Sequence, residues 1–155
     1  MNLISQLLPQ SNIIVNLDVA SKKRVFEQAG LLFENTNQVA RSQVFDSLFA
    51  REKLGSTGLG QVVSIPHGLI KGLREAVAAL VTMKEAIPFD APDGQPVNIA
   101  CILLVPEKAT DKHLQILSEL AQMFSDKQFR ESILQCKDAA EIHQLIVDWK
   151  PNVTN

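Results

Sequence analysis

The sequence predicts a single α/β domain of three layers, in which a mixed β-sheet is flanked by helices. Two nearly continuous apolar runs, 76–83 and 98–105, are typical of central strands that are covered on both faces. Segments with helical spacing of apolar residues lie between and after the strands. The 155 residues suffice for one core. We therefore expect one domain over 1–150 and a frayed tail over 151–155.

The first half of the chain predicts one strand and two helices before an extended run. A short strand is expected over 12–17, and Ser21 then offers an N-cap for an amphipathic helix. A second amphipathic helix is predicted over 42–52. The run 62–65 is extended, and we expect Pro66 to end it.

The second half predicts the two central strands and then only helices. A turn is expected over 89–94, between the strands. The helices are predicted over 111–124, 127–134 and 139–149. The first of them begins at Thr110 or Asp111 as N-cap. Its buried stripe is predicted to hold Leu114, Leu117, Leu120, Ala121 and Phe124.

Composition excludes several classes of protein. Fifteen basic and seventeen acidic residues give a net charge of −2 without a basic run, which argues against nucleic-acid binding. No apolar segment approaches the roughly 18 residues of a membrane span, and the first residues do not resemble a secretory signal. Cys101 and Cys136 lack paired spacing and are expected to be buried thiols. A cytoplasmic protein is therefore expected.

His67 is the first candidate for a reactive side chain. It lies between Pro66 and Gly68, directly after the extended run, where side chains are often presented at the end of a sheet. Imidazole can exchange a proton or accept a group on nitrogen near neutral pH. From the residues alone, a histidine that merely fits a turn explains the pattern as well.

His113 and Arg51 are the other candidates. His113 falls in the first turn of the helix predicted over 111–124, where backbone amide groups attract an anion. Arg51 lies at the end of the helix predicted over 42–52, and its planar fork of donors suits a phosphate or a carboxylate. The alternatives are a half-buried structural histidine and a cation that only complements the helix dipole.

The glycine-containing stretch 55–60 does not predict a nucleotide site. It lacks the Gly-Lys-Ser/Thr ending of a phosphate-binding loop and precedes a strand instead of a helix. The three histidines and two cysteines show no paired metal-ligand spacing, and no serine-hydrolase motif is present. We expect no cofactor and no metal.

Two motifs together resemble a known family. The stretch 51–60, Arg-Glu-Lys-Leu-Gly-Ser-Thr-Gly-Leu-Gly, is followed by Ser-Ile-Pro-His-Gly at 64–68. This combination resembles the IIA domains of the bacterial phosphoenolpyruvate-dependent phosphotransferase system, of the fructose/mannitol type. The segments 87–97, 104–106 and 113–114 are similar to its nitrogen-regulatory branch. The resemblance covers nearly the whole chain.

The resemblance implies a mannitol-type fold and a phosphoryl group carried on Nε2 of His67. It also implies that Arg51 and His113 assist phosphoryl transfer. Ser56 and Thr57 are predicted to add donors, and Leu59, Leu69 and Ile70 to rim a shallow site.

The resemblance also implies partners: an HPr-like phosphocarrier (NPr) as donor, and regulatory targets such as potassium transporters or sensor kinases. The alternatives are a free-standing sugar-uptake subunit that passes the phosphoryl group to a IIB protein, and a binding module without phosphoryl chemistry. Nothing in the sequence predicts nucleic-acid binding or membrane insertion.

Overall fold

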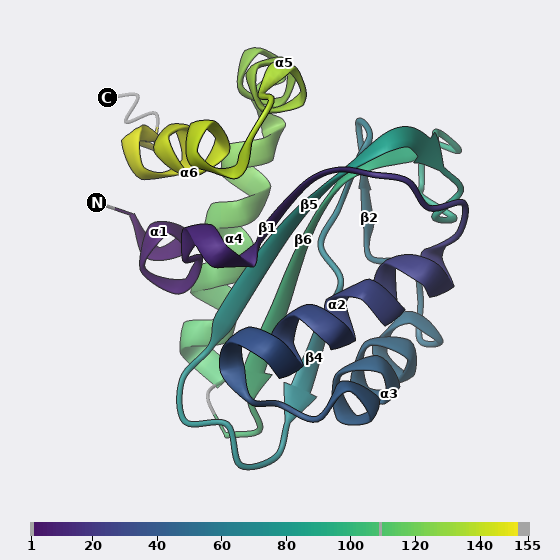
Figure 1. Cartoon of the computed structure of the whole chain (residues 1–155), viewed down its shortest axis with the longest axis vertical. Helices are drawn as coiled ribbons and strands as arrows, with labels where there is room; N and C mark the ends of the chain where they lie inside the picture. Colours follow the sequence, from purple (N-terminus) through teal and green to yellow (C-terminus); the bar gives the residue numbers. More distant parts are fainter. Residues whose placement is uncertain (1, 109, 152–155) are drawn as a thin grey trace.

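The computed structural model describes residues 2–108 and 110–151 (Figure 1). The strands are β1 (Ile13–Leu17), β2 (Gly58–Gly60), β3 (Val63–Ser64), β4 (His67–Ile70), β5 (Val77–Ile87) and β6 (Val97–Pro106). The helices are α1 (Leu3–Leu7), α2 (Lys22–Asn37), α3 (Arg41–Glu52), α4 (Thr110–Ser125), α5 (Lys127–Gln135) and α6 (Ala139–Asp148), with a 3-10 turn, η1 (Gln10–Asn12), before β1. The α/β class predicted from the sequence is confirmed.

The six strands form one mixed sheet in which β6 is the central strand. The order along the sheet is β1-β5-β6-β3-β2, and β4 also pairs with β6. Strands β1 and β5 are parallel, β5 and β6 are antiparallel, and both β3 and β4 run parallel to β6. Strand β6 therefore fixes the position of three neighbours, including the strand that begins at His67.

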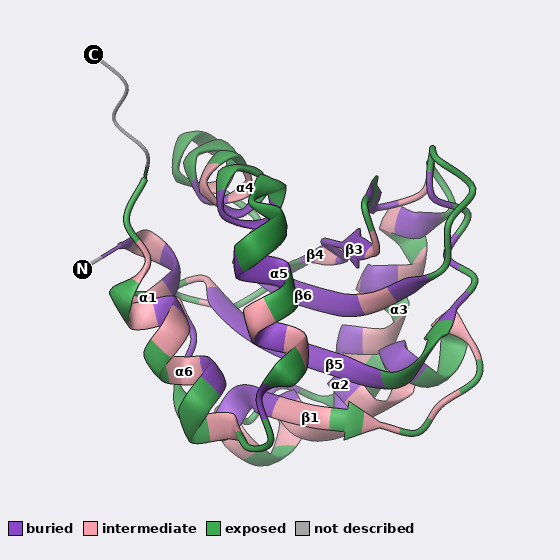
Figure 2. Cartoon of the chain, turned by 90° about the horizontal axis from the view of Figure 1, so that it is seen from above, coloured by how far each residue is buried: buried purple, intermediate pink, exposed green. Residues whose placement is uncertain are grey.

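Helices cover both faces of the sheet, which gives the three layers that the sequence predicts. One core packs α2 and α3 against the sheet, with Phe26, Phe33 and Leu48 fully buried. The other core packs α1, α4, α5 and α6 against the opposite face. Figure 2 shows β5 and β6 buried along most of their length between the two helical layers. This explains why both strands are continuously apolar.

The N-cap predicted at Ser21 is confirmed, because its hydroxyl accepts a hydrogen bond from the backbone N–H of Arg24 at 3.3 Å. The predicted strand 12–17 begins one residue later, at Ile13. Helix α1 was missing from the prediction. Its cap is Asn2, whose side chain accepts from the backbone N–H of Ser5 at 2.8 Å.

The extended chain does not end at Pro66, as we expected, but resumes at once as β4. The carbonyl of Pro66 accepts a hydrogen bond from the backbone N–H of Leu103 at 2.9 Å. Proline lacks only the N–H, so its carbonyl still pairs with a neighbouring strand. His67 is consequently the first residue of β4, opposite Leu103 of β6, and not a turn residue after the sheet.

The buried stripe predicted for α4 is rotated in the structure. Leu114 is 66% exposed and Ala121 is also exposed, whereas Ile116 and Met123 are buried. Leu120 and Phe124 lie in the core as predicted. Two helical faces carry apolar residues here, and packing against α1, α5 and the sheet selects the face that contains Ile116.

Helix α4 starts at Thr110, so Thr110 and Asp111 lie inside it and neither is its N-cap. The cap position, 109, lies outside the described residues. Of the predicted tail 151–155, residues 152–155 also lie outside them. Over the part of the chain that is described, every helix falls short of the length and hydropathy that a bilayer span requires.

Candidate functional site

A surface hollow of about 500 Å³ forms where the end of α3, the start of β4 and the start of α4 meet. Its lining consists of Ser47, Ala50, Arg51, Leu54, His67, Gly68, Leu69, Glu107 and His113. The three main candidates from the sequence come from three separate segments and are brought together here. The strand pairing of β4 with β6 positions His67, and the packing of α3 on β4 positions Arg51 in the same hollow.

The His67 ring is fixed in one orientation by a backbone contact. Its Nδ1 lies 2.9 Å from the carbonyl oxygen of Ile65. Because a carbonyl only accepts hydrogen bonds, Nδ1 carries the proton and donates it to Ile65. In the neutral ring the lone pair is then on Nε2, which is the nitrogen left free to accept a proton or another group.

The surroundings of His67 favour its neutral form. Burial is the main cause that lowers the pKa of His67 below its ordinary value, and the positive charge of Arg51, together with that of His113 when its ring is protonated, lowers it further. The hydrogen bond to Ile65 and the negative charge of Glu52 act in the opposite direction. The net result is a neutral imidazole with a nucleophilic Nε2 at neutral pH.

His113 lies beside His67, with the two ring centroids 5.4 Å apart and the planes inclined at 69°. Burial lowers the pKa of His113, so this ring is also neutral near pH 7. Its Nε2 is buried and makes no hydrogen bond to any described residue. A buried polar atom without a partner costs about 1–3 kcal/mol, which favours a ligand that supplies one.

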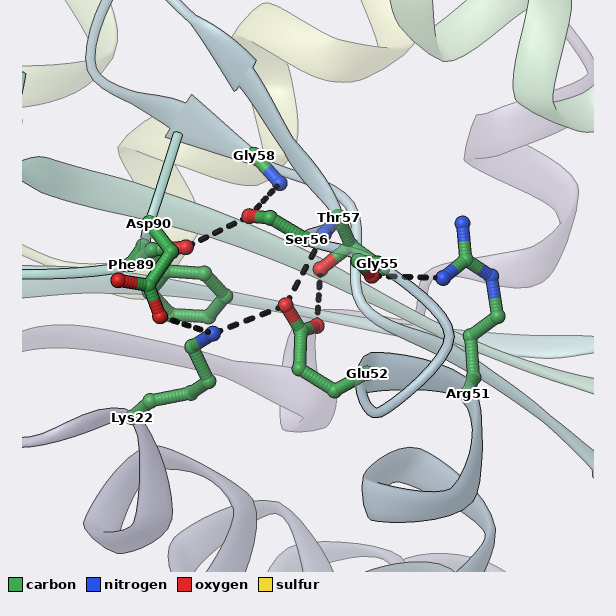
Figure 3. A network of polar contacts seen from close by, with 9 residues as sticks. All are labelled: Lys22, Arg51, Glu52, Gly55, Ser56, Thr57, Gly58, Phe89 and Asp90. Carbon is green, nitrogen blue, oxygen red and sulfur yellow. Dashed lines mark hydrogen bonds and ion pairs between the residues drawn. The ribbon is translucent and has the colours of Figure 1, made fainter. Parts of the chain in front are cut away.

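Arg51 occupies the last turn of α3, and the loop that follows the helix holds its side chain. Its Nη1 donates a hydrogen bond to the carbonyl of Gly55 at 2.8 Å (Figure 3). A guanidinium has more donors than this bond uses. The positive charge lies in the wall of the hollow that also contains His67 and His113. An anion that enters the hollow therefore meets a compensating cation.

The hydroxyl groups of Ser56 and Thr57 are engaged outside the hollow. Ser56 Oγ donates to the carbonyl of Phe89 at 2.6 Å and accepts from the backbone N–H of Gly58 at 3.0 Å (Figure 3). Thr57 Oγ1 donates to Glu52 Oε1 at 2.6 Å. Neither residue is part of the lining. Their role as phosphoryl donors stays a prediction.

Other features of the site differ from the sequence prediction. Leu69 lines the hollow as expected, but Leu59 does not, and Ile70 is buried in the core against α2 and α3. Leu54, which is 84% exposed, and Glu107 line it and were not predicted. An apolar residue just beyond a helix end was the available signal for Leu54. Among the described residues, no group of His, Cys, Asp or Glu side chains is arranged to hold a metal ion.

Comparisons with known proteins identify the family of this chain. The family model "Phosphoenolpyruvate-dependent sugar phosphotransferase system, EIIA 2" matches residues 6–149. A nitrogen regulatory protein of Pseudomonas aeruginosa is 37% identical over 146 residues, which cover 94% of this chain and 95% of that protein.

Solved structures give the same result. The crystal structure of nitrogen regulatory protein IIA-Ntr from Neisseria meningitidis is 50% identical, with a TM-score of 0.88 over 94% of this chain and 99% of that one. The mannitol IIA of Escherichia coli shares the fold at 20% identity, with a TM-score of 0.76 over 89% of this chain and 97% of that one. The chain belongs to the EIIA type 2 family of the phosphoenolpyruvate-dependent phosphotransferase system.

Proposed function

We propose that this protein is a phosphohistidine carrier and regulator. It accepts a phosphoryl group on His67 from an HPr-like phosphocarrier (NPr), and it controls target proteins by its phosphorylation state. One observation carries the proposal: a neutral histidine with its lone pair on Nε2 shares a solvent-open hollow with a guanidinium and a second neutral histidine. The family membership of the chain supports the same chemistry.

The transfer step needs no external base. The Nε2 lone pair of His67 attacks the phosphorus of the donor's phosphohistidine, a new N–P bond forms, and the donor's N–P bond breaks. The electron pair of that bond returns to the donor imidazole. The Nδ1 proton stays on His67, where the carbonyl of Ile65 stabilises the positive charge that develops on the ring.

Arg51 and His113 act on the phosphoryl oxygens. Phosphoryl transfer passes through a loose transition state, so alignment and electrostatic stabilisation provide most of the catalysis. The Arg51 guanidinium neutralises charge on the equatorial oxygens, and His113 donates a hydrogen bond to the same group. The Glu107 carboxylate in the same lining opposes tight retention of an anion, which suits a carrier that passes its load on.

Exposed apolar residues at the rim of the hollow suit the binding of a protein as phosphoryl donor. Leu54 and Leu69 are 84% and 54% exposed, and both line the hollow. Exposed apolar side chains around a polar site favour a small, transient protein interface. We expect Leu54→Ser to raise the KM for the phosphocarrier and to leave the rate at saturating donor nearly unchanged.

The regulatory role rests on the relatives and on electrostatics. The proteins of Pseudomonas aeruginosa and Neisseria meningitidis described above carry names of nitrogen regulation. A phosphoryl group adds about two negative charges to the hollow, which changes the surface that a target meets. Targets such as potassium transporters or sensor kinases then distinguish the two forms.

The decisive experiment is intact-mass analysis at alkaline pH after incubation with phosphoenolpyruvate, enzyme I and the phosphocarrier, each omitted in turn. We expect one acid-labile phosphate on His67 that requires all three components. His67→Ala should carry none, and Arg51→Ala should accept it about 100-fold more slowly, the typical cost of one lost charge-stabilising donor. His113→Ala should slow the transfer and still become labelled. Full labelling of His67→Ala would sink the assignment.

The regulatory role needs a separate test. Each form of the protein is used as bait, with the phosphorylated form kept at alkaline pH, and with purified IIB proteins added in a parallel reaction. Different partners for the two forms support the regulator. Identical partners, together with rapid transfer to a IIB protein, favour a sugar-uptake subunit instead.

A further inference from the structure

Glu52 is a buried carboxylate that lies directly beside Arg51 in the chain and outside the lining of the hollow. Its Oε2 accepts from the backbone N–H of Thr57 and from Lys22 Nζ, both at 3.0 Å, and its Oε1 accepts from Thr57 Oγ1 at 2.6 Å (Figure 3). Hydrogen bonds to an ionised acceptor are stronger than neutral ones. Glu52 thus fixes both the backbone and the side chain of Thr57.

The first consequence concerns Arg51. Residues 53–57 form the loop after α3, and Glu52 closes this loop by binding its last residue. The carbonyl of Gly55, in the middle of the loop, is the acceptor that holds the Arg51 guanidinium at 2.8 Å. The direction of the guanidinium therefore depends on a loop whose closure depends on Glu52 (Figure 3).

The second consequence concerns His67. The carbonyl of Thr57 accepts a hydrogen bond from the backbone N–H of Ile65 at 2.9 Å. The carbonyl of Ile65, in turn, accepts from Nδ1 of His67 at 2.9 Å. A path of hydrogen bonds joined by the backbone of Thr57 and Ile65 thus leads from the Glu52 carboxylate to the His67 ring.

We propose that Glu52 is a positioning residue for phosphoryl transfer, which orients the Arg51 guanidinium through the 53–57 loop and the His67 ring through Thr57 and Ile65. The inference rests on the proposed function, because it needs His67 to accept a phosphoryl group. Lys22 of α2 supports Glu52 from the other side. Its Nζ also lies 3.3 Å from Asp90 and 4.9 Å from the centre of the Phe89 ring.

Electrostatics adds a separate reason. The negative charge of Glu52 raises the pKa of His67, in opposition to burial and to the positive charge of Arg51. The same charge stabilises the positive His67 ring that forms on phosphoryl transfer. A neutral replacement removes this effect even where the fold is kept.

The test compares Glu52→Gln with Glu34→Gln. Glu34 is a matched control, because it accepts three hydrogen bonds from Arg41 at 2.8–3.0 Å, yet it lies outside the lining of the hollow. The rate of phosphoryl acceptance is measured at saturating phosphocarrier. We expect Glu52→Gln to slow it between about 10- and 100-fold, the scale of a misalignment near 1 Å. The rate for Glu34→Gln should stay within twofold of the wild-type rate.

NMR of the His67 ring nitrogens gives a signal that a purely structural role of Glu52 would leave unchanged. In the unchanged protein Nδ1 carries the proton. In Glu52→Gln we expect a mixture of tautomers and a lower His67 pKa, with neither change in Glu34→Gln. Glu52→Asp should recover part of the rate, because it keeps the charge.

Thr57→Val keeps the proposal testable if Glu52→Gln does not fold, since it deletes only the 2.6 Å bond. We expect a smaller slowing, with a shift of the His67 ring signals in the same direction. A folded Glu52→Gln or Thr57→Val protein with an unchanged rate and unchanged ring nitrogens overturns the inference. Failure of the unchanged protein to accept a phosphoryl group would instead overturn the proposed function.

Discussion

Replacing Gly68 by alanine tests whether the close approach of α3 and β4 builds the site. Gly68 is the second residue of β4, directly after His67, and it faces Ser47 of α3. A Cβ at position 68 would lie 2.4 Å from Ser47 Oγ, 2.9 Å from Ser47 Cβ and 3.1 Å from the Ser47 carbonyl carbon. The hydroxyl can rotate away, but Cβ and the backbone of the helix cannot.

The size of the effect follows from these distances. Carbon atoms pack at about 3.5–4.0 Å, so the helix has to move away from the strand by roughly 0.5–1 Å. Overpacking of this kind costs about 1–3 kcal/mol, and about 2 kcal/mol lowers the Tm of a domain of this size by roughly 4–8 °C. Because Arg51 is one turn further along α3, the same movement withdraws its guanidinium from His67. We expect acceptance to slow by up to about 100-fold.

The assay combines thermal unfolding with the time course of phosphorylation by intact mass. Ser47→Gly in the Gly68→Ala background removes the Cβ and Oγ contacts and should restore part of the transfer rate, despite the cost of about 1 kcal/mol for a glycine in a helix. Ser47→Gly alone is the control for that cost. A Gly68→Ala protein with the original Tm and the original transfer rate would refute the packing argument.

Four further predictions concern the pH dependence of transfer and of stability, the labelling of a thiol, and a turn. Because burial lowers the pKa of His67, phosphoryl acceptance should be at its plateau by neutral pH and should decline as the pH falls through that lowered pKa; a rate that still rises above neutrality contradicts this. His67 also contributes to the free energy of unfolding at pH values above its unfolded-state pKa. In an acid titration this contribution should be lost as the pH falls through the folded-state pKa of His67. Burial raises the pKa of the Cys101 thiol to about 12, so a thiol reagent at pH 8 should label Cys101 only after denaturation. Asp93 accepts the backbone N–H of Gln61 at 2.8 Å, so Asp93→Ala should speed amide exchange at Gln61 and lower the urea midpoint, whereas an unchanged exchange rate would show that the turn holds without it.

The elements that depend on local chemistry could be predicted from the sequence. The Ser21 cap and the two apolar strands follow from residue type and spacing, and the structure contains all of them. Cys101 and Cys136 are buried, as their apolar surroundings predict. The prediction failed where tertiary pairing decides. Strand β4 forms because β6 offers it an edge, which no pattern around Pro66 reveals.

The candidate site divides in the same way. His67, Arg51 and His113 carry chemistry in their own side chains, so sequence position made them candidates and the resemblance of the surrounding motifs singled them out. The importance of Glu52 and Leu54 depends on which residues surround them in the folded chain, so the sequence alone does not reveal it. Glu52 is recognisable once Lys22 of another helix and Thr57 are seen to bind its carboxylate. Leu54 is recognisable once its side chain is seen at the mouth of the hollow.

Because β4 pairs with β6, the residues of the candidate site differ in local stability. Strand β6 is buried between the two helical layers, and amide groups in such strands exchange with solvent only when the whole domain unfolds. His67 begins a strand bonded to β6, whereas Arg51 and His113 lie in terminal turns of helices, which open far more often. His67 therefore keeps its position through fluctuations that release the side chains of Arg51 and His113. Under the proposed function, such a division lets the protein loosen its hold on a phosphoryl group while His67 stays in place.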